Sequence, residues 1–130
     1  DLSTLNEQIS LLLISLIIPA AFAVMGDTGT MFTLIKPQFE AGRDRIGKNG
    51  VVRDSETHEE VLNGIIRYAD NAGLFVRGLD FSPITGPEGN IEFLAEIVRK
   101  SHNDESPGPD MVHKIVENAH SLLPHPHNGT

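Results

Sequence analysis

The sequence of 130 residues contains no cysteine, which excludes disulfide frameworks, Cys-based zinc sites, iron–sulfur clusters and thiol nucleophiles. Basic residues are scarce as well: ten Lys and Arg stand against eighteen Asp and Glu, and the formal net charge is −8. A chain this acidic does not coat nucleic acid by bulk charge, so any such contact must be local. Hydrophobic residues at 39% and charged residues at 22% are typical of one globular domain, or of part of a larger one.

One short segment has the opposite charge to the rest of the chain. Residues 36–53 hold half of all the basic residues but only two acidic ones, a net charge of +3: Lys36, Arg43, Arg45, Lys48 and Arg53 against Glu40 and Asp44. Three glycines in this segment give access to the backbone, and arginine suits phosphate. The glycine spacing matches neither a P-loop nor the dinucleotide fingerprint. A solvated loop and a loop that grips substrate phosphates are the two interpretations.

The apolar run Ile9–Val24 is 16 residues long, shorter than the ~20 residues of a membrane-spanning helix. The residues before it include Asp1 and Glu7 but no Lys or Arg, which is the reverse of a signal peptide. We therefore expect a buried strand that leads into a core helix, rather than a membrane or secretory segment. Because residue 1 is aspartate and not methionine, we also expect a processed chain or a fragment.

The middle of the chain predicts a strand, a loop and a helix. Residues 31–35 are short and apolar, which suits a buried strand that Pro37 ends. Residues 38–53 have no apolar period and predict a mobile loop. Asp54 then suits the N-cap of an amphipathic helix, which Gly73 terminates.

The second half of the chain predicts two strands followed by a short helix. Residues 74–81 and 91–98 form strands with no helix between them, so they should pair antiparallel. Residues 101–110 read as a polar linker, residues 111–119 as a short amphipathic helix, and the end of the chain as a frayed tail. The whole pattern indicates an α/β sheet with an antiparallel edge strand.

Two residues in this pattern are candidates for chemistry. Lys36 directly follows the buried strand, and ligands of open α/β sheets bind at the carboxyl ends of strands; it is a candidate general base, or else an ion-paired lysine. Glu92 lies on the strand face opposite Ile91 and Phe93, beside a glycine-bracketed turn, and solvent exposure is its alternative. The six histidines have no zinc-ligand spacing and no nucleophile elbow is present, so we expect neither a metal site nor a serine hydrolase.

Three segments around these residues resemble a known family. They read LIKPQFEAGR at residues 34–43, IGKNGVVRD at residues 46–54 and SPITGPEGNIEF at residues 82–93. In this order they are similar to motifs of the TlyA-type haemolysins, a family regarded as ribosomal RNA 2′-O-methyltransferases with an FtsJ-like domain. The resemblance covers residues 9–98. It implies an α/β fold, namely the C-terminal half of a Rossmann-like S-adenosylmethionine-dependent methyltransferase sheet with an antiparallel final strand.

The resemblance also implies catalytic residues. Enzymes of this family use a Lys-Asp-Lys-Glu tetrad around the ribose 2′-hydroxyl, and the second lysine and the glutamate fall on Lys36 and Glu92. The tetrad aspartate heads an Asp-Val-Ser strand, which residues 1–3 match after an insertion of seven residues, so that the aspartate is Asp1. Without a gap, Gln8 takes its place. The family's first lysine and Gly-rich cofactor motif fall before residue 1, so no cofactor-binding residue is assigned.

The function implied is the substrate-side portion of an RNA 2′-O-methyltransferase, acting on ribosomal RNA in the cytoplasm and inactive without the rest of the enzyme. Its cofactor would be S-adenosylmethionine, and the basic loop with Arg43, Arg45, Lys48 and Arg53 would bind RNA phosphates. Neither DNA nor a membrane is expected as a partner. Residues 1–100 would belong to the methyltransferase domain, and residues 101–130 would form linker, short helix and tail. A non-catalytic RNA- or ribosome-binding remnant and a membrane-active haemolysin are the alternatives.

A geometric condition follows for the two candidate residues. If Lys36 and Glu92 belong to one site, their strands must be near neighbours and both side chains must reach the same end of the sheet. Lys36 ends one strand and Glu92 begins an antiparallel one, so both are expected at the same edge. With one strand between them, the two Cα atoms would be ~10 Å apart, at ~4.8 Å for each strand.

Overall fold

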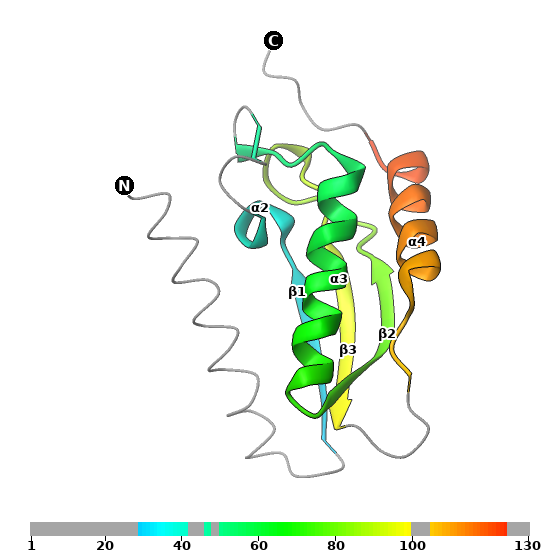
Figure 1. Ribbon diagram of the computed structural model, residues 1–130. Helices are drawn as coiled ribbons and strands as arrows, with labels where there is room; N and C mark the ends of the chain where they lie inside the picture. The colour runs from blue at the N-terminus through cyan, green and yellow to red at the C-terminus, as the bar shows by residue number, and fades with distance from the viewer. Residues whose placement is uncertain (1–28, 42–45, 48–49, 100–104, 125–130) are drawn as a thin grey trace.

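A computed structural model of the chain describes residues 29–41, 46–47, 50–99 and 105–124. These parts contain the following elements (Figure 1): β1 (Thr30–Ile35), α2 (Pro37–Glu40), α3 (Ser55–Asn71), β2 (Leu74–Phe81), a single 3₁₀ turn η3 (Pro87–Gly89), β3 (Phe93–Arg99) and α4 (Pro109–Leu122). The apolar run Ile9–Val24 lies outside the described residues, so its interpretation as a strand and a helix stays a prediction. No helix within the described ranges is long and apolar enough to cross a membrane.

The described strands form one sheet in the order β1-β3-β2, and β3 runs antiparallel to both neighbours. This confirms the antiparallel final strand and the pairing of the two strands that no helix separates. The expectation that the antiparallel strand lies at the sheet edge is wrong, because β3 inserts between β1 and β2. In β3, Phe93, Ala95 and Ile97 are all buried in the core, whereas β2 exposes Arg77 and Asp80, as an edge strand can.

The long helix α3 begins and ends where the sequence predicts. The Asp54 side chain accepts a hydrogen bond from the Glu56 backbone N–H at 3.2 Å, which satisfies one of the free donors of the first turn. Thr57 Oγ1 donates to the other oxygen of the same carboxylate at 3.0 Å. At the far end Gly73 adopts a φ of 76°, which a glycine reaches without strain and which lets the chain turn back into β2.

The core lies between one face of the sheet and the helices α3 and α4. Leu62 from α3, Phe93 and Ile97 from β3, and Val112 and Val116 from α4 are fully buried in it. Helix α4 packs against α3 and β2 (Figure 1), so the chain beyond residue 105 contributes to the same core as the sheet. Burial of apolar surface of this kind is the main favourable contribution to folding.

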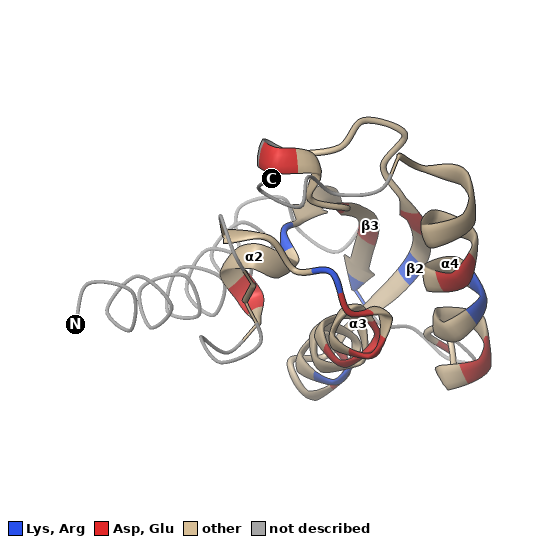
Figure 2. Ribbon diagram, turned by 90° about the horizontal axis from the view of Figure 1, so that it is seen from above, with Lys and Arg blue, Asp and Glu red and all other residues tan. Residues whose placement is uncertain are grey.

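The other face of the sheet and the outer surfaces of the helices differ in character. On the sheet, Phe32 is 75% exposed, and Leu34 and Leu94 are also exposed. The helices carry charge instead: Figure 2 shows acidic residues on α3 and along α4.

The expectation of a loop over residues 38–53 is in part wrong, because Pro37 starts a helical turn and Val51 and Val52 are fully buried.

Candidate functional site

Lys36 and Glu92 lie at the same edge of the sheet. Ile35 at the end of β1 pairs with Phe93 at the start of β3, and one step further along this register come Lys36 and Glu92. The two backbones therefore lie at the same edge, as the geometric condition requires, whereas the convergence of the two side chains stays a prediction. The expectation of an intervening strand is wrong: β1 and β3 are direct neighbours, because β3 folds back into the space beside β1.

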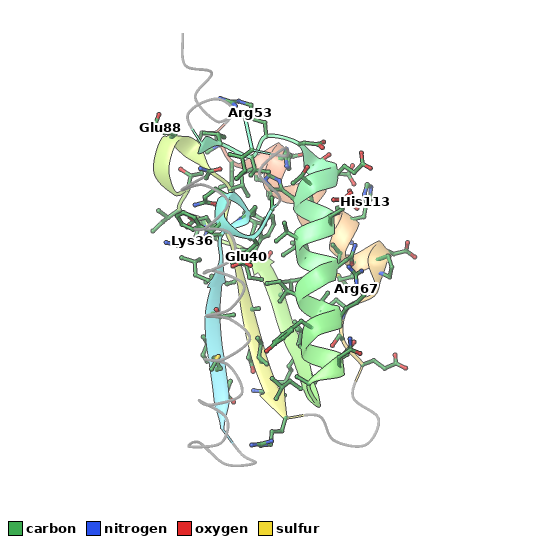
Figure 3. All side chains as sticks on the ribbon, turned by 60° about the vertical axis from the view of Figure 1, so that its left-hand side comes forward. Lys36, Glu40, Arg53, Arg67, Glu88 and His113 are labelled. Carbon is green, nitrogen blue, oxygen red and sulfur yellow. The ribbon has the colours of Figure 1, made fainter. Side chains whose placement is uncertain are left out.

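The backbone of Lys36 is fixed by the turn that follows it. Its carbonyl oxygen accepts hydrogen bonds from the N–H groups of Phe39 at 2.8 Å and Glu40 at 3.1 Å, because Pro37 starts helix α2. The Lys36 side chain is half-buried, and its Nζ lies 5.9 Å from the centre of the Phe39 ring, a cation–π distance. In Figure 3, Lys36, Glu40 and Glu88 lie on one side of α3, and Arg67 and His113 lie on the other.

Glu92 is a buried carboxylate and not the exposed strand residue of the alternative interpretation. It is only 6% exposed, and Gln38 Nε2 donates a hydrogen bond to its Oε2 at 2.8 Å. The turn before β3 also packs closely against the Glu92 carboxylate, because a Cβ placed on Gly86 would lie 2.2 Å from Glu92 Oε2. Buried carboxylates are rare in proteins unless they are paired or take part in chemistry.

Asn90 connects the turn of Glu92 to the end of the basic segment. Its Oδ1 accepts a hydrogen bond from the Val52 N–H at 3.0 Å, and its Nδ2 donates to the Gly50 carbonyl at 3.1 Å. Asn90 is itself only 2% exposed. Gly50 has a φ of 72°, so the chain turns sharply there before it enters the core at Val51. The two motifs at residues 46–54 and 82–93 are therefore physically joined.

One of a pair of histidines contacts Val52, whose N–H is bound by Asn90. His58 Nε2 lies 3.1 Å from the Val52 carbonyl oxygen, and His58 Nδ1 lies 2.7 Å from His120 Nε2 on α4. Burial, together with the neighbouring His120, lowers the pKa of His58 from 6.5 to about 4. The pair therefore links α4, α3 and the segment before α3 at neutral pH, where His58 is uncharged.

The remaining residues expected from the sequence have different outcomes. Asp1, Arg43, Arg45 and Lys48 lie outside the described residues, so their roles stay predictions. Arg53 is described and half-buried, and its Nη1 lies so close to the Gly47 backbone that a Cβ at Gly47 would come within 2.8 Å of it. Lys36 and Glu92 are brought to one edge.

Three residues of the site were not among the expected ones: Gln38, Gly86 and Asn90. Gln38 and Asn90 bind backbone or carboxylate groups in the interior, and Gly86 leaves the space that the Glu92 carboxylate occupies. All three lie inside the motifs LIKPQFEAGR and SPITGPEGNIEF. Their position inside motifs that resemble the family was the one signal that could have identified them. Composition and spacing alone do not distinguish a buried amide side chain from an exposed one.

The donors and acceptors at this edge suit a hydroxyl-bearing substrate. One ammonium group and one carboxylate can together bind a hydroxyl and move its proton. Gln38 Oε1 is a buried acceptor with no hydrogen-bond partner among the described residues.

Comparison with known proteins identifies similar chains. A family described as FtsJ-like methyltransferase matches residues 7–98. The Bacillus subtilis protein named "Putative rRNA methyltransferase YqxC" is 38% identical over 118 residues, which are 89% of this chain and 42% of that protein. The Mycobacterium tuberculosis "16S/23S rRNA (cytidine-2'-O)-methyltransferase TlyA" is 31% identical over 87 residues, which are 67% of this chain and 32% of that protein.

The fold has a counterpart among solved structures. A protein described as "Putative hemolysin from Streptococcus thermophilus" superposes with a TM-score of 0.74 at 44% identity, and the match covers 83% of this chain and 38% of that one. The chain thus spans less than half the length of each of these proteins. The matched segment contains Lys36, Glu92 and the residues that hold them.

Proposed function

The chain belongs to the FtsJ-like methyltransferase family, and from this premise we propose that it forms the substrate-side portion of an S-adenosylmethionine-dependent ribosomal RNA 2′-O-methyltransferase. The family membership and the fold support methyl transfer to RNA in general. The single observation that carries the finer proposal is the placement of Lys36 and the buried Glu92 at one edge of the sheet. The match to the family ends at residue 98, and the methyltransferase portion is proposed to end near residue 100, although helix α4 beyond it packs into the same core.

In the proposed reaction the ribose 2′-oxygen would lose its proton and take the methyl group, whose bond to the sulfonium sulfur would break, so that S-adenosylhomocysteine would leave. Lys36 would accept this proton as a neutral amine or steer it as an ammonium group, and Glu92 would orient the Lys36 side chain and balance its positive charge. Asp1 would complete the set if it takes the place of the family's aspartate. S-adenosylmethionine supplies the methyl group when bound, mainly to parts of the enzyme outside this chain. Most of the acceleration would come from the positions in which the two reactants are held.

The basic segment would hold the RNA beside this edge. Arg43, Arg45, Lys48 and Arg53 suit phosphate groups, and such contacts position a nucleic acid without reading its sequence. Asn90 fastens the end of this segment to the turn of Glu92, so RNA bound there would lie next to the proposed catalytic pair. A ribosomal RNA substrate implies a cytoplasmic protein, with no DNA or membrane partner.

The test is methyl transfer by a hybrid protein in which this chain replaces the matching segment of YqxC. We expect transfer of a labelled methyl group from S-adenosylmethionine to a ribose 2′-oxygen of ribosomal RNA, located by mass spectrometry of nucleosides. Lys36→Ala should abolish the transfer but leave RNA affinity nearly unchanged, because the proton is moved only in the transition state. Lys114→Ala, which removes an exposed lysine on α4, is the matched control and should retain full activity.

The same hybrid protein separates the alternatives. A non-catalytic remnant would bind RNA with an affinity that falls steeply with salt and would transfer no methyl group. A membrane-active haemolysin would float with liposomes in a density gradient. Either outcome, or full activity of Lys36→Ala, would contradict the proposed function.

A further inference from the structure

Gln38 contacts the proposed catalytic carboxylate from within the core. It lies in the four-residue helix α2, two residues after Lys36, and is only 8% exposed. Its Nε2 donates to Glu92 Oε2 at 2.8 Å across a sequence separation of 54 residues. An ionised carboxylate only accepts hydrogen bonds, so the amide must turn its NH₂ group toward Glu92.

This orientation leaves the other end of the amide without a partner. Gln38 Oε1 is buried and has no hydrogen-bond partner among the residues that the structure describes. A buried acceptor of this kind is costly for a folded protein, and most such atoms are paired. The amide therefore gives its donor to the Glu92 carboxylate although its own oxygen is left unpaired, which makes Glu92 the group that this side chain serves.

The carboxylate is held from a second direction by the turn before β3. A Cβ at Gly86 would lie 2.2 Å from Glu92 Oε2 and 2.6 Å from Glu92 Cδ, closer than atoms can approach. The Gly86 N–H donates to the Asn90 carbonyl at 2.7 Å, which keeps the turn in place. Glu92 thus has the Gln38 amide on one side and the Gly86 backbone on another, and little room to rotate.

We propose that Gln38 is a positioning residue that fixes the Glu92 carboxylate beside Lys36 for proton transfer from the substrate hydroxyl. The inference rests on the proposed function and adds a residue to it. The turn of α2 that fixes the Lys36 backbone thus also carries the Gln38 amide that holds the Glu92 carboxylate.

The kinetic test uses the hybrid protein and the substitution Gln38→Met, which keeps the size but removes the N–H donor. We expect kcat to fall about 10- to 100-fold, as small misplacements of reacting groups do, with KM for RNA changed less than about twofold. Gln38→His, which retains an N–H donor at similar reach, should restore part of kcat. Gly86→Ala should lower kcat in the same way from the other side, and Gly108→Ala, whose new Cβ meets nothing within 4 Å, should not.

A double-mutant cycle shows whether Gln38 acts through Glu92. In single-turnover measurements on the Glu92→Gln protein, adding Gln38→Met should change the rate less than about twofold, because no carboxylate is left to position. If the two substitutions instead multiply their effects, Gln38 works independently of Glu92 and the inference is overturned. An unchanged kcat in Gln38→Met overturns it as well.

A second measurement does not depend on methyl transfer, so failure of the inference and failure of the proposed function are distinguishable. In the 130-residue chain, NMR should show that the side-chain amide protons of Gln38 exchange much more slowly than those of the exposed Asn71. Equal exchange would mean that the contact with Glu92 is absent, and would overturn the inference even in an active enzyme. If the Gln38 amide protons exchange slowly but the hybrid protein transfers no methyl group, the proposed function is contradicted and the Gln38–Glu92 contact is not.

Discussion

Acidification should destabilise this protein through one buried histidine, His58. Its side chain is fully buried, and the pKa of its imidazole is lowered from 6.5 to about 4. Burial is the largest cause, because loss of water disfavours the charged ring, and His120 adds to it. The Val52 carbonyl and the Asp54 carboxylate act in the opposite direction but do not compensate.

The hydrogen bonds of His58 give a structural reason for the same direction. The Val52 carbonyl oxygen only accepts, so Nε2 of His58 carries the hydrogen at this 3.1 Å contact. Nδ1 of the neutral ring is then an acceptor, and His120 Nε2 donates to it at 2.7 Å. A proton added to His58 Nδ1 would face this donor, so the link between α3 and α4 would have to rearrange.

The magnitude follows from the two pKa values. Above pH 6.5, His58 is neutral in the folded and the unfolded chain and has no effect on the pH dependence. As the pH falls from 6.5 to about 4, His58 is protonated in the unfolded chain but stays neutral in the folded chain, so the free energy of unfolding decreases. At about 1.4 kcal/mol for each pH unit, the full loss amounts to about 3 kcal/mol.

The measurement is urea unfolding of the 130-residue chain at a series of pH values, compared with His58→Gln. Glutamine can donate to Val52 and accept from His120 but does not titrate, so the difference in unfolding free energy between the two proteins should change by about 3 kcal/mol between pH 6.5 and pH 4. His113→Gln, which removes an exposed histidine 3.0 Å from Glu59, is the control and should not reproduce this change. A difference that is independent of pH, or an NMR titration of His58 with a midpoint at or above 6.5, would refute the reasoning.

Three further substitutions test the packing around the site. Leu62→Ala removes a fully buried core side chain and should lower the unfolding free energy by about 3 kcal/mol in urea, whereas Met111→Ala at an exposed position should change it by less than about 0.5 kcal/mol. Asn90→Ala leaves the Val52 N–H without its acceptor and should cost about 2 kcal/mol, with faster hydrogen exchange at Val52; an unchanged exchange rate would show that this bond does not hold the segment. Gly64→Ala should raise the free energy of unfolding by about 0.5–1 kcal/mol and with it the thermal midpoint, because alanine favours the helix over glycine. The new methyl group in the middle of α3 would have Arg67 Nη2, at 3.9 Å, as its neighbour, and a lower midpoint would contradict this.

The elements with strong local signals were predictable from the sequence. Asp54 caps α3 and Gly73 ends it as expected, because capping and left-handed turns are decided by neighbouring residues. The order of strands was not predictable in the same way. Whether β3 lies beside β2 alone or also beside β1 depends on contacts between residues about 60 positions apart, and the alternation of apolar residues in β3 is compatible with both.

The candidate site was predictable to a similar extent. The position of Lys36 at the end of a strand follows from the sequence, as does Glu92 beside a glycine-bracketed turn. The expectation that residues 31–35 form a buried strand is wrong for Phe32 and Leu34, which are exposed because only one face of β1 packs against the core. The burial of Glu92 does not follow, because a glutamate at a strand start is ordinarily exposed and only the Gln38 amide and the space left by Gly86 make the buried position tolerable. Both of those features depend on segments distant from Glu92 in sequence or on a missing side chain, neither of which a local pattern reports.

Val52 explains how helices that lie away from the proposed site still control its shape. Its N–H is bound by Asn90, two residues before Glu92, and its carbonyl is bound by His58, which in turn contacts His120 on α4. The basic segment therefore enters the core at a point held between the turn of Glu92 and the packed helix pair. Because each of these bonds involves a buried group, loss of one partner would leave the other unpaired, so the segment cannot shift without cost. The position of Arg53, one residue later, is thus set by the interior of the protein.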